Sequence, residues 1–247
     1  KVLTSKAAAT VKKVSMELGG NAPFIVFEDA DLDEAVEGAM ANKYRNSGQV
    51  CVSANRIFVQ EKIYDEFATK FAERSAALKV ADGREDGSQM GPLITMAAME
   101  KVQTHVTDAI DKGANVITGG SVHNAGKQFF QPTVMTNVTS KMRIFNEETF
   151  GPVAPLIKFS NEEEVIKMAN DTNYGLAGYF YSRDIGKIWR VAEELEFGMV
   201  AINAGILSNE VAPFGGIKES GIGREGASEG IDEYLETKYM LIAGIDS

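Results

Sequence analysis

The only cysteine in the 247-residue sequence, Cys51, is the side chain best suited to act as a nucleophile. It lies in the small, polar segment 46–55, where Gly48 allows close backbone approach and backbone N–H groups could hold an oxyanion. A thiol attacks as its thiolate, so such a site must let the sulfur ionise and reach a substrate. Most free cysteines are instead small buried hydrophobes, and composition alone favours that structural interpretation of Cys51.

Glu17 is the acidic residue whose position suggests a general base. It ends the apolar segment 13–17 and is followed at once by Leu18, Gly19 and Gly20. A carboxylate at a strand end is better placed than those in solvated runs, such as residues 162–164, to be partly buried with a raised pKa. Turn carboxylates without a catalytic role are commoner, so Glu17 alone does not define a site.

The two histidines, His105 and His123, are the candidate bases for a cysteine hydrolase. We expect His105 on a helix surface and His123 in a loop, but their spacing excludes neither as a partner of Cys51. No metal site is expected, because one cysteine and two separated histidines form no ligand cluster. Residues 221–226 fit G-x-G-x-x-G, but no strand precedes them, so we interpret this match to the dinucleotide-binding fingerprint as a false positive.

Composition and charge exclude several classes of protein. Hydrophobic residues make up 44% of the chain and charged residues 24%, a globular mixture that argues against disorder. The net charge of −10 argues against binding to nucleic acid or to an anionic membrane surface. No segment approaches the ~20 apolar residues of a membrane-spanning helix. A single cysteine can form no intrachain disulfide, so we expect a reducing compartment, the cytoplasm.

Strand-like and helix-like segments alternate along the chain, which predicts an α/β fold with a mainly parallel, helix-covered sheet. Asp31 and Glu34 have the spacing of a capping box and predict a helix start. Pro155 within the strand 153–159 predicts that this strand lies near an edge. The expected strands are 13–17, 22–27, 56–60, 116–118, 133–135, 153–159, 177–181 and 199–202, and the expected helices cover 32–40, 63–78, 99–109, 162–169 and 185–195.

The last part of the chain differs in composition from the rest. Nine of the 18 residues from 213 to 230 are Gly, Pro or Ser, which predicts loop structure. An apolar run, residues 239–243, follows near the end. Because a terminal apolar strand usually pairs with another strand, we expect this run to form an interface.

Five motifs, in order along the whole chain, resemble those of the aldehyde dehydrogenase superfamily. Residues 16–21 are similar to its glutamate signature and residues 48–56 to its cysteine signature, with the same spacing of 34 between Glu17 and Cys51. The other three motifs are E-E-T-F-G-P at 147–152, N-D-T-N-Y-G-L at 170–176 and P-F-G-G-I-K with S-G-I-G-R-E at 213–225.

The resemblance implies the family's fold and its NAD- or NADP-dependent oxidation of an aldehyde to an acid. Cys51 would attack the aldehyde and form a thioester, and Glu17 would activate the water that hydrolyses it. An asparagine from the first half of the family's chain, together with the Cys51 backbone N–H, would hold the oxyanion. The residues implied for cofactor binding are Leu18, Gly19, Glu148 and Phe150.

Within the superfamily, the closest resemblance is to the succinate-semialdehyde dehydrogenase subfamily. By that resemblance, Arg45 and Ser208 would bind the distal carboxylate, and Phe214 would also contact the substrate. An arginine fork with a hydroxyl suits a carboxylate, although an arginine at a helix end is often only a solvated cation. Related enzymes for glutarate semialdehyde share this pattern, so that substrate, other aldehydes and a cysteine hydrolase remain alternatives.

Family members are longer, and this chain resembles their second half. We therefore expect residues 1–18 to end a cofactor-binding domain, 19–213 to form a catalytic domain, and 214–247 to form a return segment with an oligomerisation strand. The resemblance implies a homo-oligomer, a dimer or a tetramer. We expect the chain alone to be weakly active or inactive, and a non-catalytic interaction fragment is a third possibility.

Overall fold

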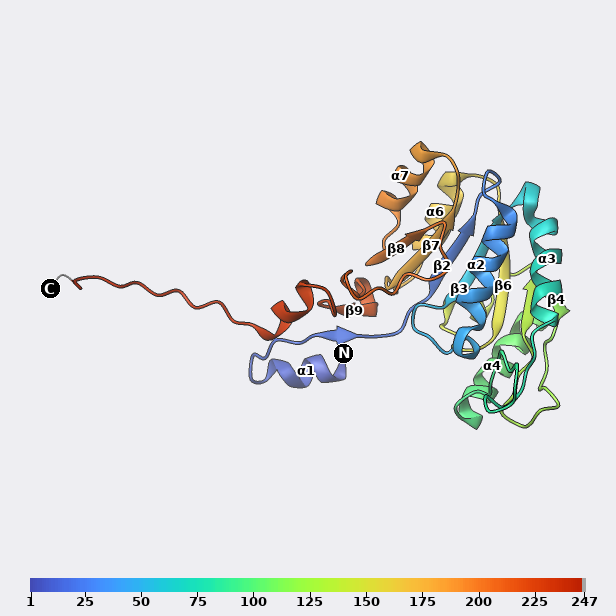
Figure 1. Cartoon of the computed structure of the whole chain (residues 1–247), viewed down its shortest axis with the longest axis horizontal. Coiled ribbons are helices and arrows are strands. Elements are labelled where there is room, and N and C mark those ends of the chain that lie inside the picture. The colour runs from blue at the N-terminus through green and yellow to red at the C-terminus, as the bar shows by residue number, and fades with distance from the viewer. Residues whose placement is uncertain (246–247) are drawn as a thin grey trace.

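A twisted seven-stranded sheet forms the centre of the computed structural model, which describes residues 1–245 (Figure 1). The strand order is β4-β5-β6-β3-β2-β7-β8. All neighbouring strands are parallel except β4 and β5, so the expected α/β fold with a mainly parallel sheet is confirmed. The strands are β2 (Ala22–Val26), β3 (Ala54–Gln60), β4 (Asn115–Thr118), β5 (Thr133–Thr136), β6 (Val153–Phe159), β7 (Ala177–Tyr181) and β8 (Met199–Ile202).

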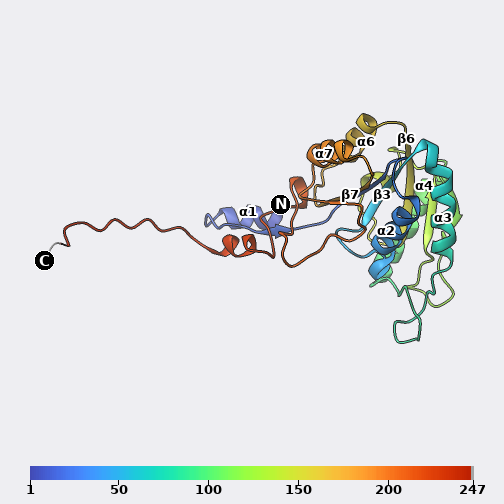
Figure 2. The same ribbon diagram turned by 45° about the horizontal axis from the view of Figure 1, so that its top comes forward.

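Two apolar clusters lie on opposite faces of this sheet because successive strand residues point to opposite sides. In β2, Phe24 and Val26 belong to the cluster that includes α2 and α3, whereas Ile25 belongs to the cluster that includes α4 to α7. Figures 1 and 2 show these two layers of helices from two directions. The helices are α2 (Leu32–Tyr44), α3 (Tyr64–Ala76), α4 (Met96–Asp111), α5 (Arg143–Asn146), α6 (Glu162–Asn170) and α7 (Ile185–Glu194).

The helix starts follow the capping residues in the sequence. The Asp31 side chain accepts a hydrogen bond from the Glu34 backbone N–H at 3.3 Å, as the predicted capping position requires. Asp184 caps α7 in the same way.

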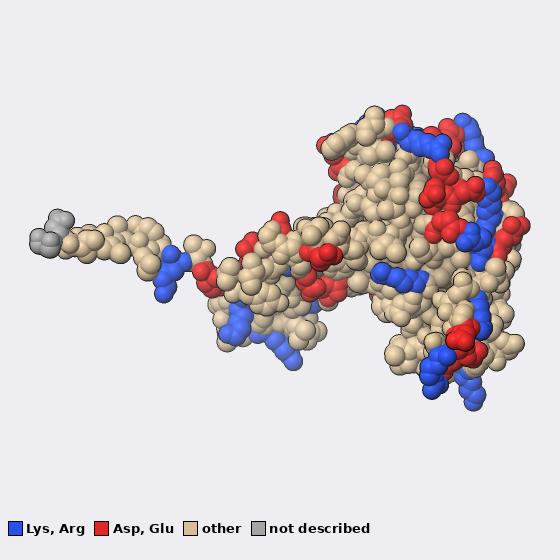
Figure 3. Space-filling model, in the orientation of Figure 1, with Lys and Arg blue, Asp and Glu red and all other residues tan. Residues whose placement is uncertain are grey.

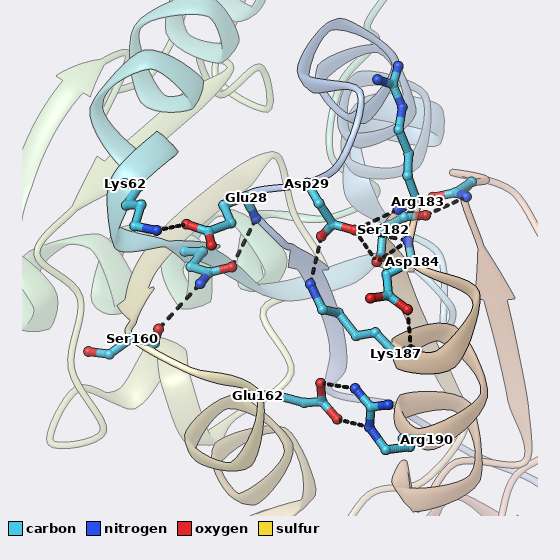
Figure 4. Close-up of polar contacts among 12 residues, drawn as sticks. Glu28, Asp29, Lys62, Ser160, Glu162, Ser182, Arg183, Asp184, Lys187 and Arg190 are labelled. Carbon is cyan, nitrogen blue, oxygen red and sulfur yellow. Dashed lines mark hydrogen bonds and ion pairs between the residues drawn. The ribbon is translucent and has the colours of Figure 1, made fainter.

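The carboxyl ends of β2 and β7 are joined by a polar network around Asp29 (Figure 4). The Asp29 carboxylate accepts hydrogen bonds from the Ser182 hydroxyl at 2.7 Å, from the Lys187 ammonium at 2.8 Å and from two backbone N–H groups at the start of α7. The pKa of Asp29 lies well below its usual value, because these bonds outweigh the effect of burial. The network fastens α7 to the end of the sheet.

Two sequence-based expectations are wrong. Strand β6 is an interior strand, not one near an edge, and Pro155 lies where its pairing with β5 ends and its pairing with β3 begins at Leu156. Proline has no N–H to donate, and it is tolerated here because β6 changes its hydrogen-bonding partner strand at this position. His105 is not on a helix surface but fully buried, because it lies on the apolar side of α4.

A segment near each end of the chain takes part in a small two-stranded sheet outside the main one. Helix α1 (Val2–Ala8) leads to β1 (Met16–Glu17), which pairs antiparallel with β9 (Gly221–Ile222). Four short 3-10 helices, η1 (Arg45–Gly48), η2 (Glu61–Ile63), η3 (Lys218–Ser220) and η4 (Glu229–Tyr234), complete the described elements. None of the helices in residues 1–245 has the length and apolarity that crossing a bilayer requires.

Beyond η4 the chain extends away from the body without regular structure (Figure 1). The apolar run 239–243 is largely exposed, with Tyr239 at 83% and Leu241 at 77% exposure, and Figure 3 shows few charges on this extension. The run forms no strand within the described chain, because a strand requires a partner. Residues 246 and 247 of the expected return segment lie outside the described residues.

Candidate active site

The candidate residues gather at the amino ends of the parallel strands. Residues 17–21 enter β2, the loop 45–53 enters β3, the loop 147–152 enters β6, and residues 170–176 enter β7. In open α/β sheets, ligands more often bind beyond the carboxyl ends of the strands. Here the carboxyl ends of β2 and β7 are occupied by the Asp29 network, and the candidate residues lie at the opposite edge.

The Glu17 and Cys51 side chains lie close enough for each to shift the pKa of the other. Burial raises the pKa of Glu17, and the polar interaction with Cys51 partly opposes this change. Burial raises the pKa of Cys51 to about 11, and the charge of Glu17 beside it contributes in the same direction. The structure therefore places a thiol next to a carboxylate that can accept its proton.

The backbone of the cysteine loop is tightly turned. Asn46, Ser47 and Gly48 all have positive φ angles, between 51° and 73°. A Cβ on Gly48 would lie only 2.2 Å from the Gly151 carbonyl oxygen, so this position requires glycine. The backbone N–H groups of Cys51 and Val52 lower the pKa of the thiol, which partly opposes the effect of burial.

A buried polar network, which the sequence did not reveal, holds the loops together. The Asn55 amide donates to the Asn21 side-chain oxygen at 2.6 Å, and its own oxygen accepts from the Thr149 N–H at 2.9 Å. The Arg56 guanidinium donates to the Asn21 carbonyl at 2.9 Å. These residues are at most 3% exposed. The sequence did contain one indication of this network, the polar side chains at the start of an otherwise apolar strand. Such side chains, when buried, need hydrogen-bond partners.

Glu148, Leu18 and Gly19 line one hollow, together with Tyr174 and residues of α1. The Glu148 carboxylate accepts the Gly20 N–H at 2.9 Å, and burial raises its pKa. Phe150 does not line this hollow. It lies in a different depression beside Asn46, Gln49 and Pro92, with a φ angle of 56°. The structure thus brings three of the four expected cofactor residues together.

Ser220 connects the Gly-rich segment to this hollow. Its hydroxyl donates to the Gly19 carbonyl at 2.7 Å and accepts from the Gly175 N–H at 2.9 Å. The G-x-G-x-x-G match at 221–226 begins within β9, and a turn follows it, not an α-helix. This context differs from the strand–turn–helix arrangement of a dinucleotide-binding fingerprint.

Arg45 and Ser208 line a second, smaller cleft next to Cys51. They come from the end of α2 and from the segment after β8, and the neighbours of Cys51, Val50 and Val52, are in the same wall. The remaining lining residues include Asn42, Ser53 and Tyr179. Phe214 lies outside this lining, but it packs on the same apolar cluster as Cys51.

Two buried bases lie behind these loops. The His105 ring nitrogens contact Thr149 and Glu147, both at 3.2 Å, which leaves neither nitrogen free for Cys51. Burial lowers the pKa of His105. Lys43, which the sequence did not single out, is 1% exposed and donates to the Ala54 carbonyl at 2.8 Å. Burial lowers the pKa of Lys43 to about 7.

No group of three or more His, Cys, Asp or Glu side chains in residues 1–245 could hold a metal ion. The second candidate histidine, His123, lies in a loop, where its ring accepts the Ala125 N–H at 3.2 Å. Of the candidate bases for Cys51, Glu17 is therefore the one that lies beside it.

Comparison with known proteins gives a consistent family relationship. The profile described as the aldehyde dehydrogenase family matches residues 1–240. The chain is 57% identical to the 3-sulfolactaldehyde dehydrogenase of Pseudomonas putida, with 100% of this chain and 51% of that protein aligned. It is 56% identical to the NADP(+) succinate-semialdehyde dehydrogenase of Escherichia coli, over 97% of this chain and 50% of that protein. A glutarate-semialdehyde dehydrogenase of Pseudomonas putida is 57% identical, over 98% of this chain and 50% of that protein.

Solved structures agree with this relationship. The succinate-semialdehyde dehydrogenase of Burkholderia pseudomallei superposes with a TM-score of 0.93 at 60% identity, covering 94% of this chain and 48% of the other. The betaine aldehyde dehydrogenase of Staphylococcus aureus in complex with NAD+ superposes with a TM-score of 0.92 at 41% identity, covering 96% of this chain and 48% of the other. The chain spans about half the length of the curated relatives it matches.

Proposed function

Because the chain belongs to the aldehyde dehydrogenase family, we propose that it is the catalytic portion of an enzyme that oxidises succinate semialdehyde to succinate through a thioester on Cys51. The observation that carries this proposal is that the Cys51 and Glu17 side chains lie beside each other, close enough for each to shift the pKa of the other. A nucleophile next to a carboxylate base is the arrangement that thioester formation and hydrolysis need.

The chain's own residues supply the covalent steps. Glu17 accepts the thiol proton, and the Cys51 sulfur forms a bond to the aldehyde carbon, which becomes tetrahedral. The backbone N–H groups of Cys51 and Val52, which already lower the pKa of the thiol, would help to hold the developing oxyanion. After oxidation at this carbon, Glu17 removes a proton from water, the water oxygen attacks the thioester carbonyl, and the acid leaves as the C–S bond breaks.

A nicotinamide cofactor fits one wall of the larger hollow. Gly19 has no side chain, and a Cβ there would lie 2.8 Å from a Glu148 carboxylate oxygen, so the glycine leaves this carboxylate accessible. Glu148 would hold the ribose hydroxyls, and Leu18 and Gly19 line the same hollow. Phe150, which lines the other depression, would contact the cofactor only after a change in its loop. The bound nicotinamide would take up the hydride of the tetrahedral carbon.

The smaller cleft supports a substrate with an anion at the end remote from the aldehyde. Arg45 and Ser208 can together bind such a group, with Phe214 on the adjoining apolar surface. The names of the relatives, sulfolactaldehyde, succinate-semialdehyde and glutarate-semialdehyde dehydrogenase, all describe aldehydes of this class. Succinate semialdehyde is our first choice. Glutarate semialdehyde is the second candidate, because its additional methylene changes only the distance between the carboxylate and the aldehyde carbon.

A cysteine hydrolase is a weaker proposal, because both ring nitrogens of His105 are engaged elsewhere. A non-catalytic interaction fragment is the third proposal, and it rests on the exposed run 239–243.

We also propose a cytoplasmic homo-oligomer that associates through this run. Since the chain spans about half of its relatives, we expect the 247 residues alone to turn over slowly.

The test is NAD- or NADP-dependent oxidation of succinate semialdehyde, glutarate semialdehyde, sulfolactaldehyde and the uncharged butanal. We expect the anionic aldehydes to be preferred and Cys51→Ser to abolish oxidation. Equal use of butanal would contradict the anion-binding cleft, and activity in Cys51→Ser would contradict the thioester. Loss of thiol chemistry in the His105→Gln, His123→Gln double variant would favour a hydrolase. Cofactor titration with size-exclusion mass would identify a non-catalytic fragment.

A further inference from the structure

One side chain, Asn42 of α2, links the two segments that build the smaller cleft. Its side-chain oxygen accepts the Ala54 N–H at 2.5 Å, directly after the cysteine loop. Its amide donates to the Gly205 carbonyl at 2.8 Å, in the segment that carries Ser208. Asn42 is 6% exposed; its bond to Ala54 is buried and its bond to Gly205 is partly buried, so loss of either would leave a largely desolvated polar group without its partner.

Tyr179 extends this link to the cysteine loop. Its hydroxyl donates to the Val52 carbonyl at 2.8 Å, one residue from Cys51, and it lies close enough to the Asn42 side chain for that side chain to affect its pKa. Asn42 is therefore bonded to Ala54 after the cysteine loop and lies beside Tyr179, which is bonded to the loop itself. Both Asn42 and Tyr179 line the cleft between Arg45 and Ser208.

The segment after β8 sits directly on the backbone of α2. A Cβ on Gly205 would lie 2.2 Å from the Gly38 carbonyl oxygen, so no side chain separates the two backbones. Gly38 and Asn42 are four residues apart and lie on one face of α2. The close approach of Gly205 and its bond from Asn42 fix where Ser208 stands relative to Arg45 at the end of the helix.

We propose that Asn42 is a positioning residue that sets the distance between the anion-binding cleft and the Cys51 sulfur, and so selects the chain length of the substrate. This inference rests on the proposed function, because it takes Arg45 and Ser208 as the partners of the substrate's distal anion. Without Asn42, no side chain bonds to both the Ser208 segment and the end of the cysteine loop. The distance between a bound anion and the Cys51 sulfur is then less tightly fixed.

Alkylation of Cys51 by ω-iodoalkanoates tests this spacing in the 247-residue chain itself. The sulfur bonds to the terminal carbon, iodide leaves, and the thiol proton passes to Glu17 or solvent. ω-Iodobutyrate has the same carbon spacing between its reactive carbon and its carboxylate as succinate semialdehyde. Its shorter and longer homologues, iodopropionate and iodopentanoate, vary the distance between the carboxylate and the reactive carbon. The uncharged control is ω-iodobutyramide.

In the wild-type chain we expect iodobutyrate to react faster than its amide and faster than both homologues. In Asn42→Leu, which is similar in volume but makes no hydrogen bond, we expect the preference for iodobutyrate over its homologues to fall about fivefold. The rate with the amide should change less than about twofold. Asn170→Leu is the matched control, since Asn170 also bridges a carbonyl, of Glu194, and an N–H, of Glu196.

The outcomes separate the two proposals. A wild-type chain with no preference for iodobutyrate over its amide would overturn the anion-binding cleft and the inference with it. A normal charge preference with an unchanged length profile in Asn42→Leu would overturn the inference alone. An unfolded variant is recognised because every reagent would then react at the rate of free glutathione. In that case Asn42→Ala, which introduces no new bulk, is tested instead. Its charge preference and its length profile then decide between the same outcomes.

Discussion

The Cys51 thiol lies beside the carboxylate of Glu17, a residue 34 positions earlier in the sequence, and each group shifts the pKa of the other. Both pKa values are raised by burial, and that of Cys51 reaches about 11 in part because Glu17 is beside it. Attack by the sulfur requires loss of the thiol proton, and Glu17 is the neighbouring carboxylate that can accept it.

Replacing Glu17 by Gln should lower the pKa of the Cys51 thiol. The change removes a negative charge and a charged acceptor, both of which favour the protonated thiol, while burial stays the same. At a pH below the pKa, each unit of decrease raises the thiolate fraction about tenfold. We expect iodoacetamide to label Cys51 several-fold faster near neutral pH, with the rate–pH profile displaced to lower pH. Glu163→Gln, an exposed carboxylate on α6, is the control, and an identical profile in both variants would contradict the pairing.

Replacing Arg45 by Met should remove the preference of the cleft for anions. A charged hydrogen bond contributes about 1.5–3 kcal/mol, so we expect iodobutyrate labelling to slow by about 10- to 100-fold while the amide is little affected. Ser208→Ala should have a smaller effect, about 2- to 10-fold. Arg84→Met, at an exposed loop arginine paired only with Asp82 among the described ion pairs, is the matched control. Equal slowing of acid and amide would mean that Arg45 does not bind the anion.

His105 should make the stability of the fold depend on pH. Burial lowers its folded pKa, so between that value and ~6.5 the unfolded chain binds more protons than the folded chain. Stability should therefore decrease as the pH falls below about 6.5, with a limiting slope of about 1.4 kcal/mol per pH unit. Urea unfolding between pH 5 and 7.5 measures this slope. His105→Gln should reduce it and His123→Gln should not; a slope that His105→Gln leaves unaltered would refute the assignment.

Asp29 should stabilise the fold through its bonds to α7. Its folded pKa is depressed, so its contribution is complete above the unfolded pKa of ~3.9 and is lost as the pH falls toward the folded value. We expect Asp29→Asn to cost about 1–2 kcal/mol of unfolding free energy at neutral pH, with the gap to wild type narrowing below pH ~4. Asp86→Asn, at an exposed loop position, should be near neutral. A gap that stays constant down to pH 2 would contradict this explanation.

Local sequence patterns predicted most of the elements but not every environment. The strands and helices followed from apolar spacing, and Asp31 marked a helix start that its side chain does cap. His105 was misplaced because its polarity was taken as a sign of exposure. It stands three residues after Val102 and four before Ala109, a spacing that places it on the buried face.

Long-range contacts in the site could not be predicted from local patterns. Asn42 and Gly205 are far apart in the sequence, and nothing in either segment indicates that they meet. The same applies to Asn21, Asn55 and Thr149, whose bonds depend on how three loops arrive at one edge of the sheet. The run 239–243 was expected to be a strand, yet a strand needs neighbouring hydrogen-bond groups that the described chain does not place beside it.

The most direct test of the proposed site is acylation of Cys51 by the mono-nitrophenyl ester of succinate. The sulfur attacks the ester carbonyl, nitrophenolate leaves, and the product is the same succinyl thioester, formed without a cofactor. We predict continuous nitrophenolate release by the wild-type chain, no release by Cys51→Ser, and in Glu17→Gln one rapid equivalent followed by arrest. Intact mass should show a succinyl group on the arrested protein. Continuous turnover by Glu17→Gln at the wild-type rate, or release by Cys51→Ser, would contradict the account.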